Sequence, residues 1–354
     1  MPASAARSPQ SLVTRRIAVL AVLILAQSLG LSGRASGQEG WGLVVDPKGA
    51  VAFTDVPEGA VWRIRPGGEP EKIALDKHTR ALVLAADGHL YGSEPAPEAA
   101  VWRVDPEGSL SYVLPPSTNL PMDLQAFTVD GQGALYSTSE GSGTVLLQKR
   151  RPDGKVETLA GGGRGHADGK GSAARFTGID GMAWGPGDLL YVADGPYVRT
   201  VSPDGTVKTL GKGPLTEPVW EEDLLGLAVA PDGTVYAADY GGRRVLRMAP
   251  SAEARTLLEG GRYWSPTGVA VAGEDVYVLE QPRKPLSALA DAGIGPYLRV
   301  LRVVPGKEPV VLARLWGRNT VAAAASAAAL LVILVLFWRR RRRSRYGSSR
   351  RIRL

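Results

Sequence analysis

Carboxylate side chains recur at the ends of predicted strands, about 40–55 residues apart, and they are the residues best suited to chemistry. The five equivalent acids are Asp55, Glu94, Asp194, Asp239 and Glu280. A sixth equivalent position holds Ser139, beside Glu140. Oxygen ligands from several such positions would bind a hard cation such as Ca²⁺ if they met at one point. The interpretation that we prefer is structural: each acid accepts hydrogen bonds from the amides of its own turn.

Other kinds of site find little support in the sequence. The chain has no cysteine and three histidines, so a histidine zinc site would need His78, His89 and His166 to converge. The glycine run at 161–163 lacks the Lys-Ser/Thr that follows in a phosphate-binding loop. No catalytic residue can therefore be named from a motif.

Two series of turn sequences divide residues 41–313 into six similar units. Within each unit, one turn such as Pro231-Asp232-Gly233 separates two apolar runs, and a second such as Ser202-Pro203-Asp204-Gly205 follows further on. Two hairpins predict four strands per unit. The predicted second strands align Ala52, Tyr91, Tyr136, Tyr191, Tyr236 and Tyr277 at one position.

A four-stranded unit that recurs at this interval is typical of a β-propeller blade, so we expect an all-β, six-bladed propeller over residues 38–313. A β-sandwich with regular hairpins is the alternative, but it does not explain why aligned positions agree across six units. In a propeller the first strand of each blade lines the axis. Asp180 immediately precedes such a strand and is the best single metal candidate. The full candidate set is Asp180, Asp194, Asp239 and Glu94.

Residues 160–183 and the Tyr-Val-Ala-Asp that ends at Asp194 resemble the NHL repeat. The matching residues are Gly161, Asp168, Gly169, Gly171, Ala174, Phe176, Gly181, Tyr191 and Asp194, with Gly226, Tyr236 and Asp239 in the next unit. This resemblance implies a propeller that acts mostly in binding.

The chain also resembles the senescence-marker-protein/gluconolactonase family, another six-bladed group. The family's Glu-Gly start, its Asn-Asp, its Asn-Gly and a further acid correspond here to Glu39-Gly40, Met122-Asp123, Asp180-Gly181 and Leu225. The resemblance implies a lactonase or esterase that holds a divalent cation in the axial channel.

The two ends of the chain predict export and a membrane anchor. Residues 1–37 are basic, then apolar, then small, as in a secretory signal peptide; an uncleaved anchor is the alternative. Residues 321–338 form an uncharged run of about the length that spans a bilayer, after a short linker at 314–320. The arginine-rich tail at 339–354 predicts that the C-terminus lies inside and the propeller outside the cytoplasm.

The formal charge of +7 comes from these ends, since four arginines precede residue 38, nine follow residue 338, and neither end has an acid. The segment between them is acidic, which argues against nucleic-acid binding. We expect a monomeric, membrane-anchored binding module or scaffold for a protein, peptide or glycan, without a cofactor. The alternative function is a lactonase or esterase of the gluconolactonase type, which would need Ca²⁺ or another divalent cation.

Overall fold

The computed structural model describes residues 40–94, 97, 99–120, 122–211, 213–215, 224–250, 253–283, 295–317 and 335. The predicted signal peptide, the arginine-rich tail and all of the predicted span except Val335 lie outside these residues. Within the described part of the chain, no helix has the length and apolar character needed to cross a bilayer.

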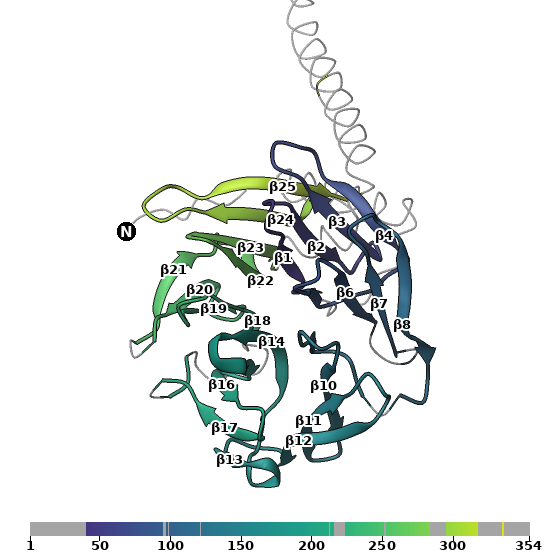
Figure 1. Ribbon diagram of the computed structural model, residues 1–354. Coiled ribbons are helices and arrows are strands. Elements are labelled where there is room, and N and C mark those ends of the chain that lie inside the picture. The colour runs from purple at the N-terminus through teal and green to yellow at the C-terminus, as the bar shows by residue number, and fades with distance from the viewer. Residues whose placement is uncertain are drawn as a thin grey trace, which may run out of the picture. The chain divides into compact units, whose positions relative to one another are not determined.

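Six antiparallel sheets are arranged around one axis, which confirms the six-bladed propeller (Figure 1). Each blade is built from one continuous stretch of chain in the strand order first-second-third-fourth. The first strands are β1 (Leu43–Val45), β5 (Leu82–Leu84), β9 (Phe127–Val129), β14 (Ile179–Gly185), β18 (Leu224–Val229) and β22 (Trp264–Ala272). The second strands are β2 (Val51–Asp55), β6 (Leu90–Glu94), β10 (Leu135–Gly141), β15 (Leu189–Asp194), β19 (Val235–Asp239) and β23 (Asp275–Pro282).

The outer half of each blade carries the third and fourth strands. The third strands are β3 (Ala60–Ile64), β7 (Ala99–Val104), β11 (Thr144–Arg150), β16 (Tyr197–Val201), β20 (Arg244–Met248) and β24 (Pro296–Val303). The fourth strands are β4 (Glu71–Leu75), β8 (Leu110–Ser117), β12 (Val156–Gly163), β17 (Thr206–Thr209), β21 (Arg255–Glu259) and β25 (Val310–Trp316). Blade 4 gains a fifth strand, β13 (Gly169–Lys170), and two short 3-10 helices, η1 (Gly171–Ala173) and η2 (Pro186–Asp188).

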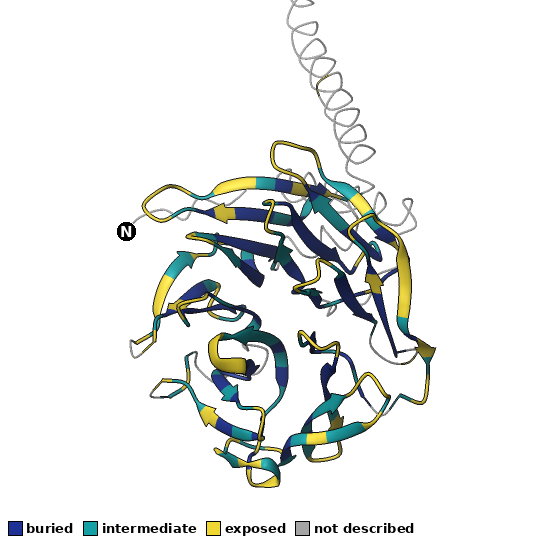
Figure 2. Ribbon diagram, viewed as in Figure 1, coloured by how far each residue is buried: buried dark blue, intermediate teal, exposed yellow. Residues whose placement is uncertain are grey.

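The strand register confirms the repeat that the sequence predicts. Each aligned second-strand residue, from Ala52 to Tyr277, pairs with the equivalent residue of its first strand. Buried residues concentrate in the first three strands, and exposed residues lie in the turns and fourth strands (Figure 2). The blades therefore bury one another's faces, as expected for a propeller.

In the described strands, blades 1 and 6 share no strand, and side chains join them at the closure of the ring. Phe53 of β2 and Leu279 of β23 belong to one buried cluster with Leu298 of β24. The Tyr297 hydroxyl also donates to Asp55 Oδ2 across this junction at 2.8 Å. The residues Gly295, Trp316 and Gly317 belong to a separate compact unit.

Candidate functional site

The strand-end carboxylates already have partners among the side chains and amides of the protein. Asp239 is fully buried and accepts bonds from the Gly242 amide and from Arg244 Nε, both at 2.8 Å. Glu94 forms an ion pair with Lys77 at 3.0 Å. Two of the four predicted metal ligands are therefore already paired with groups of the protein.

Asp55 and Glu280 are also fully buried at the ends of their second strands. Burial raises the pKa of Asp55, against hydrogen bonds from Trp62 and Tyr297 that lower it. Burial likewise raises the pKa of Glu280, against its ion pair with Arg299. Desolvation is the dominant influence on the pKa of both groups.

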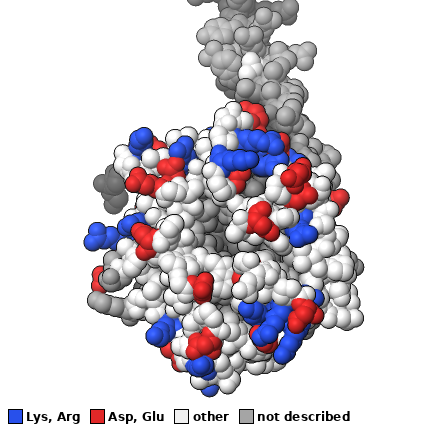
Figure 3. Space-filling view, in the orientation of Figure 1, with Lys and Arg blue, Asp and Glu red and all other residues white. Residues whose placement is uncertain are grey.

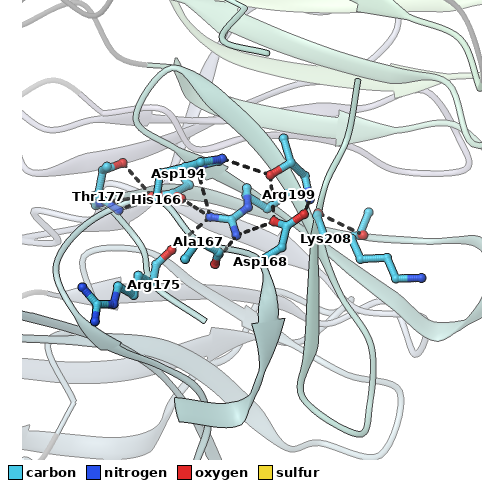
Figure 4. Close-up of polar contacts among 11 residues, drawn as sticks. His166, Ala167, Asp168, Arg175, Thr177, Asp194, Arg199 and Lys208 are labelled. Carbon is cyan, nitrogen blue, oxygen red and sulfur yellow. Dashed lines mark hydrogen bonds and ion pairs between the residues drawn. The ribbon is translucent and has the colours of Figure 1, made fainter. Parts of the chain in front are cut away.

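Asp194 lies in the densest polar network of the propeller, which Figure 4 shows. Its Oδ1 accepts bonds from the Thr177 amide at 2.6 Å, the Thr177 hydroxyl at 2.7 Å and the Gly178 amide at 3.1 Å. Its Oδ2 accepts from Arg199 Nη1 at 2.7 Å, and both charged side chains are fully buried. Arg199 Nη2 also donates to Asp168 Oδ1 at 2.8 Å. All of the bonds named here hold the glycine-rich loop onto blade 4.

His166 extends this network toward the fourth strand. Its ring stacks on Tyr197 with 3.8 Å between the ring centroids. Because an arginine N–H can only donate, Nδ1 accepts from Arg199 Nη1 at 3.5 Å and Nε2 carries the proton, facing Thr209 Oγ1 at 3.2 Å. Burial, followed by the nearby charge of Arg199, lowers the pKa of His166. The histidine thus lies at the surface of the blade, with its ring held against Tyr197 and Thr209.

The axial channel contains a second, different group of residues, set by β-bulges in three blades. The pairing of first and second strands slips by one residue between Ile179 and Gly181, between Leu224 and Leu227, and between Pro266 and Gly268. Asp180, Leu225 and Thr267 lie inside these slips. Bulges redirect the side chain of the extra residue and are frequent beside active sites.

In each first strand, one residue pairs with the aligned second-strand residue (Ala52 in blade 1, a tyrosine in the others). The residue three positions before that partner gives one corresponding residue per blade, near the start of the first strand. We call these six residues the mouth layer: Trp41, Arg80, Gln125, Asp180, Leu225 and Thr267. The sequence prediction included Asp180 but missed Arg80 and Gln125. For blade 3 the family resemblance points to Met122-Asp123, whereas counting back from Thr128, the partner of Tyr136, gives Gln125.

Arg80 connects three consecutive blades within the mouth layer. Its Nη1 donates to Gln125 Oε1 at 3.3 Å, and its guanidinium carbon lies 5.9 Å from the centre of the Trp41 ring. Gln125 Nε2 donates in turn to Asp123 Oδ2 at 3.4 Å. Burial raises the pKa of Asp123, while this hydrogen bond and the charge of Arg80 oppose the shift.

A ring of small residues narrows the channel directly after the mouth layer. We call these six positions the glycine ring: Gly42, Ala81, Ala126, Gly181, Gly226 and Gly268. A Cβ added to Gly181 would overlap the carbonyl oxygen of Leu225 in the next blade, and one added to Gly226 would lie 2.9 Å from Thr267 O. The first strands therefore approach one another backbone to backbone at this level.

Beyond the glycine ring the channel widens into a cavity of about 780 Å³. Its walls are the first strands of all six blades, and most lining side chains are apolar, including Leu43, Met182 and Val229. Asp130, Tyr136 and Lys149 supply a polar edge on blade 3. In the face that Figure 3 shows, charged side chains lie mainly around the outside, and uncharged residues predominate toward the middle.

The predicted metal ligands do not converge. Asp194, Asp239 and Glu94 lie at second-strand ends of three different blades, whereas Asp180 lies in the mouth layer. Across residues 40–317, within the described ranges, no three His, Asp or Glu side chains are grouped so that they could hold a metal ion. The mouth layer offers a single carboxylate, Asp180, together with the positive charge of Arg80, and this set does not fit the cation that the gluconolactonase resemblance implies.

Comparisons with solved structures found several chains that are similar to this one. A calcium-binding protein, regucalcin, from Agrobacterium tumefaciens is similar with a TM-score of 0.54 and 17% identity, covering 81% of this chain and 95% of its own. A gluconolactonase from Xanthomonas campestris has a TM-score of 0.50 and 14% identity, covering 68% and 83%. Virginiamycin B lyase from Staphylococcus aureus has a TM-score of 0.48 and 14% identity, covering 79% and 86%.

The family is shown by the sequence itself. A search of curated proteins found no significant match. The sequence model of the SMP-30/Gluconolactonase/LRE-like region, in contrast, matches residues 40–279, which include the first strands of all six blades. This chain therefore belongs to the SMP-30/gluconolactonase/LRE-like family.

Proposed function

We propose that the protein binds a small, oxygen-rich molecule at the mouth layer and hydrolyses a lactone or ester bond in it. The observation that carries this proposal is the family match over residues 40–279, which covers the whole channel. The mouth layer supports it, because it contains the polar residues Arg80, Gln125 and Asp180 of three blades, and a bulge sets the position of Asp180.

The reaction requires few groups from the protein. Water adds to the carbonyl carbon, the bond to the ring or ester oxygen breaks, that oxygen takes up a proton, and a hydroxy acid or an acid and an alcohol are released. Among the described residues at this end of the channel, the carboxylates of Asp180 and Asp123 are the groups that we propose to take the proton of the water. Burial raises the pKa of Asp123, which brings this carboxyl closer to the range of an effective general base.

The test is a panel of γ- and δ-lactones and aryl esters, assayed by acid release with the purified full-length chain. Parallel assays contain EDTA, Ca²⁺, Mn²⁺ or Zn²⁺. We expect turnover of at least one lactone and a loss of about 100-fold in kcat for Asp180→Asn or Asp123→Asn, as for removal of a general base. Asp153→Asn, in an exposed turn, is the matched control. Absence of turnover with every metal would contradict the proposal.

A second candidate function is binding without hydrolysis, by a scaffold that recognises a protein, peptide or glycan. Within the described residues, the lack of a group of three metal-ligating side chains favours it. A glycan array and a peptide library probed with the full-length chain would test it. Saturable binding of an unmodified ligand, together with an inactive lactone panel, is the result that this function predicts.

We also propose that the propeller lies outside the cytoplasm and is held at a membrane by residues 321–338. The charge distribution of the sequence supports this topology, since the acids are confined to the propeller side and nine arginines follow the apolar run.

A further inference from the structure

The mouth layer presents a guanidinium at the end of the channel where the family resemblance implies a divalent cation. Arg80 in blade 2, Asp180 in blade 4 and Leu225 in blade 5 each lie three residues before the residue that pairs with the aligned tyrosine of the blade. A cation among these residues would have to lie near a fixed positive charge, and it would lack an acid at Leu225. Coulomb repulsion therefore opposes the binding of a divalent cation there.

The side chain of Arg80 is held in place while most of its donors stay available. Trp41 lies beside the guanidinium at 5.9 Å, a cation–π distance. In the described part of the chain, Gln125 Oε1 is the one hydrogen-bond acceptor of this guanidinium. A guanidinium carries five N–H donors in a planar fork, so the remaining donors can bind two oxygen atoms of a ligand at once.

We propose that Arg80 binds the carboxylate or carbonyl oxygens of a polyhydroxylated acid or its lactone, in place of a divalent cation. A bidentate arginine–carboxylate pair matches both the charge and the planar geometry of such a group. The neighbouring acceptors suit the rest of the ligand, because the carboxylates of Asp180 and Asp123 can accept bonds from its hydroxyl groups. The choice of ligand class rests on the proposed function, whereas the position of the positive charge does not.

Binding of D-gluconate to the full-length chain, followed by isothermal titration calorimetry, tests this inference. D-glucitol is the matched probe, since it keeps the hydroxyl groups and lacks the carboxylate. We expect gluconate to bind more tightly than glucitol, and added NaCl to weaken gluconate binding alone. CaCl₂ without gluconate should give no saturable heat.

Two substitutions at Arg80 separate charge from geometry. Arg80→Gln removes the charge and should weaken gluconate binding about 10- to 100-fold, as expected for loss of charge-assisted hydrogen bonds. Arg80→Lys keeps the charge, loses the fork and should bind with intermediate affinity. Arg103→Gln, an exposed arginine on β7 of the same blade, is the control and should bind as the unaltered chain does. Thermal melting verifies that each variant is folded, and the gluconate–glucitol comparison does not depend on any variant.

Equal affinity of the unaltered chain for gluconate and glucitol, or no binding of gluconate, would overturn the inference. So would saturable Ca²⁺ binding that Asp180→Asn abolishes. Failure of the proposed function is distinguishable from these results. Gluconate binding through Arg80 with an inactive lactone panel refutes hydrolysis only, whereas EDTA-sensitive hydrolysis that Arg80→Gln leaves unchanged refutes the role of Arg80 only.

Discussion

Replacing Asp194 by asparagine tests whether the carboxylate at the end of β15 is structural. The carboxylate serves two sets of donors: Thr177 and Gly178 at Oδ1, and Arg199 at Oδ2. An asparagine of the same shape has one oxygen, so its NH₂ group must face one of these sets, donor against donor. Arg199 would remain fully buried but would keep its ion pair with Asp168 and its bonds to two carbonyl oxygens.

The cost follows from this geometry. Breaking a buried ion pair costs about 3–5 kcal/mol, and the remaining partners of Arg199 favour the lower end, about 3 kcal/mol. For a domain of this size that loss corresponds to a fall in Tm of about 6–12 °C. Circular dichroism melts and urea titrations of the full-length chain measure it, with Asp153→Asn in an exposed turn as control. A loss below about 1 kcal/mol, equal to that of the control, would refute the structural role of Asp194.

Three further predictions concern the glycine ring, the protonation of His166 and the membrane topology. Gly181→Ala should lose about 1–3 kcal/mol in the free energy of unfolding, because the added Cβ overlaps a backbone atom of the next blade. Gly131 has open space around it, so Gly131→Ala is the control and should not lose stability. Equal melting temperatures of the two variants would contradict the close packing at Gly181. His166 has a folded-state pKa below its unfolded value of about 6.5, so the unfolded chain takes up the proton first and stability should fall as the pH drops through about 6.5. His166→Gln should flatten that loss in melts between pH 7 and 5, and parallel curves would argue against it. Protease added outside cells or spheroplasts should digest the propeller and spare an epitope placed after Leu354; loss of that epitope with cytoplasmic markers intact would reject the topology.

The fold was predictable because its determinants are local and repeated. Turn residues such as Pro231-Asp232-Gly233 recur with each hairpin, and the tyrosines aligned with Tyr236 share one register in the sheets. The mouth layer was less predictable, since its alignment depends on bulges that add one residue in three blades. Asp180 was found because it precedes a recognisable glycine. Arg80 has no such neighbour. It is assigned to the mouth layer only by counting back from Val83, the residue that pairs with Tyr91.

The partners of the strand-end acids were foreseeable only in part. A turn amide bonds to Asp239, as the structural interpretation expects, and the amide of Glu58 does the same for Asp55. The arginines opposite these acids were not foreseen, since Arg199 and Arg244 meet them across a hairpin and not within a turn. A carboxylate pattern at regular spacing therefore has two physical explanations, and the positions of nearby cations decide between them.

The glycine ring gives the two ends of the channel different chemistry. Polar side chains gather in the mouth layer on one side, whereas the cavity of about 780 Å³ on the other side has mostly apolar walls. At the glycine ring the channel narrows to a space of about 30 Å³, which is lined by Gly42, Gly181 and Gly226. A sugar-sized ligand bound at Arg80 cannot pass this constriction without separating the blades. Recognition at the mouth layer must therefore depend on the six residues of that layer and the loops above it, while any ligand of the larger cavity enters from the opposite end.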